Sequence, residues 1–270
     1  MPQDVRCDGV LIGAMQKSPP GTHPTGRTAI MTPLPFPATP GARAHQVWDY
    51  RRPAGGGIVE LGTVRGLDVA LPVHFHREDQ LTFVLAGRRR FVIAGEMCEA
   101  GPGEGVHIPA DLPHRSLRGA EEVVCVNLYT PPGLHAASDL IAGLARHWRR
   151  TGGLGWADLT RIAEEHRHSL GTGLEPASLF TGCDAWDSVG EAARRAGMSR
   201  EGYSRRFRKE HGVPPHAFRL QDRLNEARGL LRAGEPIAAV AADTGFTDQS
   251  HLGRCFRRAF GVTPGRYRAG

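Results

Sequence analysis

The feature that most constrains how this chain folds is an internal repeat in its last third. Residues 189–197 align with residues 237–245 at an offset of 48, and residues 205–219 align with residues 254–268 at an offset of 49. The copies therefore differ by one inserted residue, and the same structural unit is expected twice. Nine aligned pairs are identical: Ala193/Ala241, Gly197/Gly245, Arg205/Arg254, Phe207/Phe256, Arg208/Arg257, Gly212/Gly261, Val213/Val262, Pro215/Pro264 and Arg219/Arg268.

Each copy has the pattern of two short helices joined by a turn. An alanine-rich segment ends at a glycine, which can adopt the left-handed conformation that closes a helix. A second helix begins at Ser199 or Thr247, whose hydroxyl is expected to cap it, and it carries arginines on one face and aromatic residues on the other. The glycines expected to end these helices are Gly197, Gly212, Gly245 and Gly261. This pattern is typical of a helix–turn–helix unit with a basic second helix, present twice.

A longer helix is predicted between the copies, from Pro214 to about Ala233 and closed by Gly234. About 18 residues at 1.5 Å each extend about 27 Å. This length suits two helices that enter successive major grooves of DNA, about 34 Å apart. The alternative is a protein-binding solenoid of helical hairpins. A solenoid is built from more than two repeats and does not require a face of arginines. Two copies that each carry such a face therefore favour DNA binding.

The excess positive charge lies in the same part of the chain. The net charge is +6, and residues 183–270 hold 16 Arg or Lys and 10 Asp or Glu. Residues 1–182 are neutral, with 18 basic and 18 acidic residues. A neutral front joined to a basic module indicates that the module meets a polyanion. The alternative is an ordinary solvated basic surface.

Two segments, GFTDQSHLGRCFRR at residues 245–258 and FGVTPGRYR at residues 260–268, closely resemble the signature of AraC/XylS-type transcription regulators. The resemblance continues upstream through residues 223–228 and the first copy, and it covers about 185–270. It implies an all-α domain of seven helices with two helix–turn–helix motifs that bind double-stranded DNA.

The resemblance also implies roles for side chains of the two basic helices. By position in the motif, the base-facing residues should be Arg200, Glu201, Ser204 and Arg205 in the first copy and Gln249, Ser250, His251 and Arg254 in the second. Arginine pairs bidentately with guanine and glutamine with adenine, which agrees with this role. Arg208, Arg257 and Arg258 are better placed for phosphates, which add affinity without sequence information. The apolar residues expected in the core are Phe207, Phe246, Leu252 and Phe256.

The front of the chain has the pattern of a β domain. Segments rich in β-branched or aromatic residues occur at residues 57–61, 81–85, 90–93 and 123–128, and they are separated by Gly and Pro turn signals. Their spacing predicts an antiparallel sandwich or barrel. Behind it, helices are predicted around residues 140–148 and from about Trp156 to Ser169. These helices either pack on the β domain or pair with a second chain, and pairing into a homodimer is slightly favoured.

Two stretches resemble the cupin motifs, the first in residues 66–87 and the second in residues 103–114. Metal-binding cupins use two His, a Glu and a third His, and the corresponding residues here are His74, His76, Gln80 and His114. The first two are one residue apart, so on a strand both side chains point to one face. Two positions depart from the motifs: Gln80 replaces the carboxylate, and Asp111 stands where the second motif usually has Gly.

These four polar side chains are predicted to line the pocket of a small-molecule effector. No cofactor is required, and the alternative is a divalent metal in the same pocket, held by the three imidazoles and the amide. The corresponding alternative function is a metal-dependent cupin enzyme, of dioxygenase or isomerase type, fused to a DNA-binding module. The sequence has no Ser/His/Asp constellation and no phosphate-binding loop, so no catalytic residue is assigned.

The prediction is therefore a multidomain α+β chain, in which a cupin-like antiparallel β-barrel precedes an all-α domain with two helix–turn–helix motifs. The expected division is a flexible Pro-rich segment (1–45, with Met31 as an alternative start), a cupin-like effector-binding domain (46–132), a helical linker (133–172) and the DNA-binding domain (173–270). Five scattered cysteines without a CxxC pair, the lack of a long apolar stretch and the lack of a signal-peptide pattern predict a cytoplasmic protein that contacts no membrane. We expect a transcription regulator, not an enzyme, with RNA polymerase as a further candidate partner.

Overall fold

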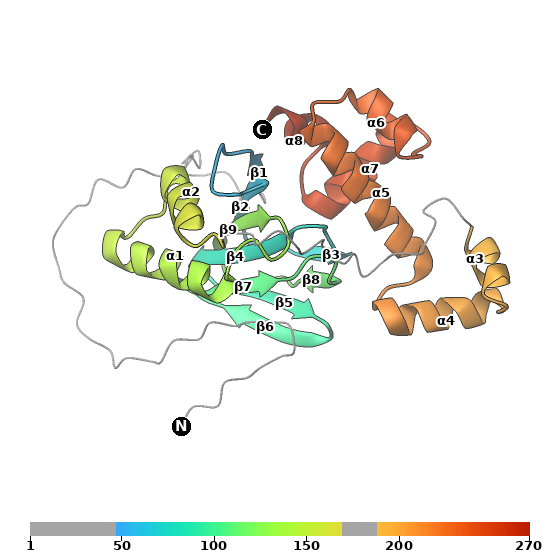
Figure 1. The fold of residues 1–270 in the computed structure, drawn as a ribbon, viewed down its shortest axis with the longest axis horizontal. Helices are drawn as coiled ribbons and strands as arrows, with labels where there is room; N and C mark the ends of the chain where they lie inside the picture. Colours follow the sequence, from blue (N-terminus) through green and yellow to red (C-terminus); the bar gives the residue numbers. More distant parts are fainter. Residues whose placement is uncertain (1–46, 169–187) are drawn as a thin grey trace.

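The computed structural model describes residues 47–168 and 188–270, which form a β-rich front part and a helical C-terminal part (Figure 1). The predictions for the Pro-rich segment 1–45, for Met31 as a start and for a linker after residue 168 lie outside the described residues. Among the described residues, no helix is both long enough and apolar enough to cross a lipid bilayer.

The front part contains two antiparallel sheets that face each other. The five-stranded sheet has the order β1-β2-β9-β4-β7 and the four-stranded sheet has the order β3-β8-β5-β6. The strands are β1 (Val47–Arg51), β2 (Glu60–Gly66), β3 (Leu71–His74), β4 (Asp79–Ala86), β5 (Arg89–Ile93), β6 (Glu96–Ala100), β7 (Gly105–Ile108), β8 (His114–Ser116) and β9 (Val123–Thr130). The predicted strands at 81–85, 90–93 and 123–128 are confirmed as parts of β4, β5 and β9.

The prediction of a strand at residues 57–61 is largely wrong. The strand begins only at Glu60, because Gly55, Gly56 and Gly57 all have positive φ angles, which belong to a turn and not to a strand. The prediction of a barrel also needs correction. No described strand pairs from one sheet to the other, so the fold is a sandwich. Edge strands β1 and β3 are not joined to each other; helix α7 contacts both of them instead.

The C-terminal part contains six helices between residues 188 and 270, where the family resemblance implies seven for about 185–270. They are α3 (Val189–Arg195), α4 (Arg200–His211), α5 (Pro215–Arg232), α6 (Ile237–Asp243), α7 (Gln249–Phe260) and α8 (Pro264–Ala269). We call α3 and α4 the first helix pair, and α6 and α7 the second helix pair. The long helix predicted between the copies is confirmed as α5, with 18 residues.

The helix ends follow the repeat. The four glycines predicted to end helices all have φ between 63° and 76°, in the left-handed region. Ser199 caps α4 as predicted, since its hydroxyl accepts a hydrogen bond from the Gly202 amide at 3.1 Å. The prediction that Thr247 caps α7 is wrong, because Asp248 accepts the bond from the His251 amide at 2.7 Å. At the offset of 49 Asp248 aligns with Ser199, so Thr247 is the residue inserted in the second copy.

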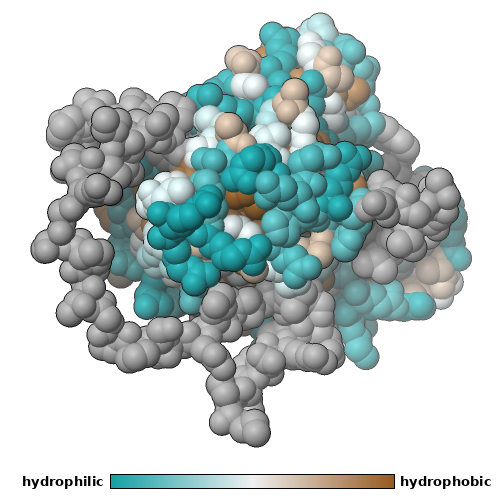
Figure 2. Space-filling model, turned by 60° about the vertical axis from the view of Figure 1, so that its left-hand side comes forward, coloured by the Kyte–Doolittle hydropathy of each residue, from teal (hydrophilic) through white to brown (hydrophobic). Residues whose placement is uncertain are grey.

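Helices α1 (Ala137–Thr151) and α2 (Trp156–Glu165) confirm the two helices predicted behind the β domain. Their apolar residues, among them Leu140, Leu144 and Leu159, are buried against the outer face of the five-stranded sheet. Figure 2, which views the side where these helices lie, shows a mainly hydrophilic described surface. The apolar faces of α1 and α2 are thus used within the chain, as the packing alternative expected.

The second helix pair shares one hydrophobic core with the interior of the sandwich. Trp48 and Tyr50 on β1 pack in the same cluster as Phe256 and Phe260 on α7. The Tyr50 hydroxyl also donates a hydrogen bond to the carbonyl oxygen of Phe260 at 2.9 Å. The first helix pair lies further from the sheets (Figure 1) and has a separate, smaller core, to which Phe75 is the one buried contributor from the described front part.

The repeat offers a direct test of how α7 packs on the sandwich. Gly212 and Gly261 end α4 and α7 in the same conformation, so changing either to Ala places a side chain in the left-handed region, at about 1–2 kcal/mol. A methyl group at Gly261 would also collide with the indole ring of Trp48, whereas at Gly212 the nearest atoms, on Pro113, are 3.9 Å away. We expect Gly261→Ala to lower the urea midpoint of unfolding clearly more than Gly212→Ala. Equal losses would show that α7 does not contact Trp48 in solution.

Candidate functional site

The sandwich brings together the polar residues singled out in the cupin-like motifs. His74 ends β3, His76 follows it, Gln80 is on β4 and His114 begins β8. All four side chains are buried, with exposed fractions from 2% to 7%. The ring centroids of His74 and His114 lie 4.3 Å apart and those of His76 and His114 lie 4.9 Å apart. We call these four residues the histidine cluster.

Each imidazole in the cluster is held by a backbone carbonyl. The Nδ1 atoms lie 2.8 Å from the oxygen of Pro72 for His74, 2.6 Å from the oxygen of Glu78 for His76 and 2.9 Å from the oxygen of Leu112 for His114. A carbonyl only accepts, so Nδ1 carries the proton and Nε2 keeps a free lone pair. Within this cluster, three buried atoms have no hydrogen-bond partner: His76 Nε2, His114 Nε2 and Gln80 Oε1.

Burial also keeps the three imidazoles neutral. Desolvation is the largest cause that lowers the pKa of His74 to about 3 and the pKa of His76 to about 4, and it lowers the pKa of His114 well below its ordinary value. Neutral imidazoles with a fixed tautomer present acceptor atoms toward the interior, which suits hydroxyl or N–H groups of a ligand, or a metal ion.

The arrangement fits a resident metal only in part. The donor types and the carbonyl-bound Nδ1 atoms are those of a metal site. However, within residues 47–168 and 188–270 no group of three His, Cys, Asp or Glu side chains is arranged to hold one ion. The Gln80 amide is also engaged, because its nitrogen donates to Thr82 Oγ1 at 2.9 Å and this hydroxyl donates to Asn127 Oδ1 at 2.7 Å. The geometry is therefore that of a buried polar cluster, and it does not require an ion.

The second departure from the motif has a conformational explanation. Asp111 has a φ of 60°, in the left-handed region that glycine adopts most easily and that Asp tolerates better than most residues. Its amide donates a hydrogen bond to the carbonyl oxygen of His76 at 2.7 Å. The loop before His114 is thus tied to the segment that holds His76.

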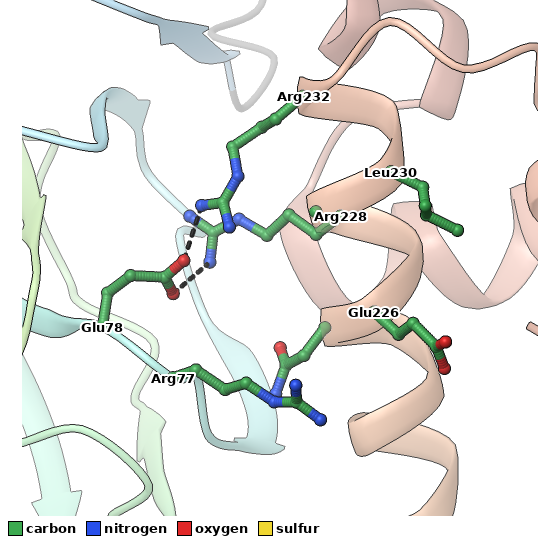
Figure 3. Close-up of a pocket in the computed structure, with 8 residues that line it drawn as sticks. Arg77, Glu78, Glu226, Arg228, Leu230 and Arg232 are labelled. Atoms are coloured by element: carbon green, nitrogen blue, oxygen red, sulfur yellow. Dashed lines mark hydrogen bonds and ion pairs between the residues drawn. The ribbon is translucent and has the colours of Figure 1, made fainter. Parts of the chain in front are cut away.

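A second polar cluster lies beside the first, where the sandwich meets α5 (Figure 3). Arg228, 1% exposed, lies 3.2 Å from Glu60 and 3.8 Å from Glu78, while Arg232 lies 2.6 Å from Glu78. Burial by itself raises the pKa of Glu78, but the two arginines outweigh it and lower this pKa to about 2. We call these four residues the ionic cluster. The sequence does not reveal this cluster, because glutamates and arginines more than 140 positions apart form no local pattern.

A cavity of about 260 Å³ opens next to the ionic cluster and is lined mainly by α5 and by the segment that precedes β4. The residues that line it include Arg77, Glu78, Asn225, Glu226, Arg228 and Arg232. The carbonyl oxygen of Glu78 is also the partner of His76 Nδ1. The two polar clusters are therefore in direct contact.

The residues predicted to contact DNA lie on α4 and α7, and most are exposed. Exposed side chains are those of Arg200, Glu201, Arg205, Arg208, Gln249, Ser250, Arg254, Arg257 and Arg258, while Ser204 and His251 are partly buried. The opposite faces are buried as predicted, with Phe207 5% exposed on α4 and Phe256 fully buried on α7. The His251 ring lies against Phe246, with centroids 5.3 Å apart. Each helix thus has an exposed basic face, and its opposite, apolar face is packed in the core.

Comparison with known proteins supports both parts of this description. A model of the helix-turn-helix domain family matches residues 192–270, and a model of the cupin domain family matches residues 67–129. The transcriptional activator NphR of Rhodococcus sp is 29% identical over 225 residues, which are 82% of this chain and 66% of that protein. The sequence resemblance to AraC-type regulators and the resemblance to cupins are confirmed.

Two further relatives match shorter parts of the chain. The HTH-type transcriptional regulator MtrA of Neisseria gonorrhoeae is 36% identical over 86 residues, which are 32% of this chain and 28% of that protein. A protein of Streptomyces antibioticus named as an AraC-like transcription regulator is 30% identical over 179 residues, 60% of this chain and 55% of its own length. The chain therefore spans between about a quarter and two thirds of the length of these curated relatives.

The lowered histidine pKa values predict a loss of stability in mild acid. As pH falls below about 6.5, the unfolded chain takes up protons on these imidazoles, while the folded chain does not until pH approaches 4. The unfolded state is then favoured, by up to about 1.4 kcal/mol per pH unit for each histidine. Urea unfolding at pH 7.5, 6.5, 5.5 and 4.5, in the presence of a chelator, measures this slope.

The variant His114→Gln should show a shallower slope than the original chain, whatever its stability at pH 7.5. His216→Gln, at an exposed position on α5, is the matched control and should keep the original slope. An unchanged slope in His114→Gln would contradict a buried, neutral His114.

Proposed function

We propose that this chain, in which an AraC-type helix-turn-helix domain follows a cupin domain, is a one-component transcription regulator that binds DNA and is controlled by a small effector. The observation that carries the proposal is the construction of α4 and α7. Each has an exposed basic face opposite a buried aromatic one, and each belongs to one copy of the repeat. The named relatives are transcriptional regulators, which favours regulation over the alternative of a cupin enzyme.

Both helix pairs are proposed to be helix–turn–helix motifs that read double-stranded DNA. In α4, Arg200, Glu201, Ser204 and Arg205 would face base edges, and in α7 Gln249, Ser250, His251 and Arg254 would do so. Arg208, Arg257 and Arg258 would contact phosphates and so contribute affinity that falls with salt concentration. The side chain of His251 packs against Phe246, so its reach toward a base is shorter than that of Arg254.

The histidine cluster is proposed to be the effector pocket. Its burial and its unpartnered acceptor atoms support this role, because a buried polar atom without a partner is costly unless a ligand or water satisfies it. No cofactor is required for sensing. A divalent cation held by His74, His76, Gln80 and His114 is a second form of the proposal, favoured only by the free Nε2 lone pairs, and it would offer a Lewis acid to an effector oxygen. Metal analysis of protein purified without chelator tests it.

The pocket is proposed to communicate with the DNA-binding helices through Phe75. His74 and His76 face the interior, whereas Phe75 between them stacks on Phe218 of α5 with ring centroids 4.8 Å apart. The carbonyl oxygen of Phe75 accepts hydrogen bonds from Gln221 and Asn225, both at 3.1 Å. A ligand that shifts the histidines would thus shift a residue that belongs to the core of the first helix pair.

The proposed role also implies a cellular location and further partners. A regulator that reads DNA acts in the cytoplasm of a bacterial cell, and a homodimer and a contact with RNA polymerase are further parts of the proposal. Since the apolar residues of α1 and α2 are packed on the sheet, a dimer would have to use other surfaces or their polar faces.

Arg254→Ala should weaken binding to the cognate DNA by about 1–3 kcal/mol and relax the preference at one base position, since it removes a bidentate contact. Operator sequences selected from a randomised pool, followed by titration of single-base variants, measure both effects. Arg146→Ala removes the same charge from an exposed position on α1 and should leave affinity unchanged. If Arg254→Ala binds the cognate DNA with unaltered affinity, Arg254 does not contact a base edge.

Phe75→Ala should loosen the first helix pair selectively. The described core of this pair contains only Phe75, Phe207, Val213 and Phe218, and a Phe→Ala change in a core costs about 3–5 kcal/mol. Amide hydrogen exchange should become faster in α4 and stay unchanged in α7, and a DNA footprint should shorten by one half-site. Val73→Ala, at a half-exposed neighbouring position, should change neither. Unchanged protection of α4 would contradict the proposed route.

A further inference from the structure

Arg89 is a buried positive charge without a negative partner. Its side chain points into the sandwich from β5, where Arg89, Phe91 and Ile93 alternate inward with exposed or half-buried neighbours. The residue is 3% exposed. Among the described residues, no Asp or Glu lies within ion-pair distance of it. This distinguishes Arg89 from Arg228, which has two carboxylates beside it.

The contacts that Arg89 does make do not neutralise its charge. One guanidinium nitrogen donates to the carbonyl oxygen of Val69 at 2.6 Å, while the buried Nε has no partner. The guanidinium lies 5.2 Å from the Phe91 ring centroid and 5.9 Å from that of Trp48. Aromatic faces attract a cation weakly compared with the cost of removing a guanidinium from water. Desolvation accordingly lowers the pKa of Arg89.

Other buried atoms without a hydrogen-bond partner have complementary chemistry. Beside Arg89 Nε, the indole Nε1 of Trp48 is a second buried donor without a partner, whereas His76 Nε2, His114 Nε2 and Gln80 Oε1 are buried acceptors without one. Arg89 and His114 face the same interior from adjacent strands β5 and β8, where His114 pairs with Ile93, four residues along β5 from Arg89. The charge of Arg89 also contributes to the lowered pKa of His74 and of His114, so the two groups lie within electrostatic range.

From these atoms we infer that the effector is a small organic acid, whose carboxylate binds Arg89 and Trp48 and whose hydroxyl or N–H groups face the histidine cluster. This inference rests on the proposed effector-sensing function and names the chemical class of the effector. A carboxylate supplies the missing counter-charge and accepts from both orphan donors. Hydroxyl or N–H groups satisfy the acceptors, which a purely apolar acid would leave unpaired.

The test uses the full chain and the smallest alkyl carboxylate, so that the shape of the ligand does not decide the result. Thermal unfolding is followed in 50 mM sodium acetate, and in 50 mM acetamide with sodium chloride at the same ionic strength. We expect acetate to raise the melting temperature by about 2 °C or more relative to acetamide. The variant Arg89→Met should lose this difference, and Arg89→Lys should keep part of it, because a positive charge remains.

The melting temperature of Arg89→Met without any ligand tests the inference even if acetate binds weakly. Without any carboxylate, Arg89→Met should melt at the same temperature as the original chain or higher, because an uncompensated buried charge is removed. A structural role of Arg89 predicts a clear loss instead. Equal responses of the original chain and Arg89→Met to acetate, together with a lower melting temperature of the variant, would overturn the inference.

These outcomes are separable from those that test the proposed function. If the chain binds a selected operator but its melting temperature ignores acetate and the Arg89→Met exchange is destabilising, only the acidic effector is refuted. If the acetate response holds but no operator can be selected, the carboxylate site stands and the regulatory function fails.

Discussion

The arrangement of the two parts of the chain depends on one buried interaction, that of Arg228 with Glu60 and Glu78. The guanidinium lies between carboxylates of the sandwich and the aromatic rings of Tyr129 and Phe260, at 4.3 Å and 5.2 Å from their centroids. Partial separation of Arg228 from the two carboxylates would leave buried charges without partners, which is strongly destabilising. Intermediate positions of α5 relative to the sandwich are therefore unfavourable. The two parts are either docked, with the charges paired, or apart, with the charges hydrated.

The helical part of the fold is readable from the sequence because its signals are local. The glycines that end helices, the capping Ser199 and the spacing of Phe207 and Phe256 each act within a few residues, and the repeat gives every signal twice. The error at Thr247 arose where the copies differ by an insertion. Closure of the β domain was not predictable in this way, because it depends on whether β1 and β3 meet, and α7, some 180 residues further along the chain, contacts both strands.

The candidate site likewise contains residues that the sequence predicts and residues that only the structure reveals. His74, His76 and His114 could be named from the resemblance to the cupin motifs, and the structure places them at the end of β3, just after it and at the start of β8. The charged groups around them could not. Arg89 has the pattern of an ordinary strand residue among other arginines, and only the structure shows that its side chain is buried without a carboxylate. Glu60, Glu78 and Arg228 are brought together by docking of the two parts, which no local pattern encodes.

A ligand controls a conformational equilibrium only to the extent that it binds one arrangement better than the other. The short segment 74–78 is placed to create such a difference. His74 and His76 belong to the proposed effector pocket, Phe75 completes the core of the first helix pair, and Glu78 joins Arg228 and Arg232 on α5. The carbonyl of Glu78 also holds His76 Nδ1 at 2.6 Å. A ligand that repositions His76 therefore acts on two of the attachments of α5 at once, those through Phe75 and through Glu78. Through this link the effector would control the equilibrium between the docked and the separated arrangement of the two parts, and not the position of a single side chain.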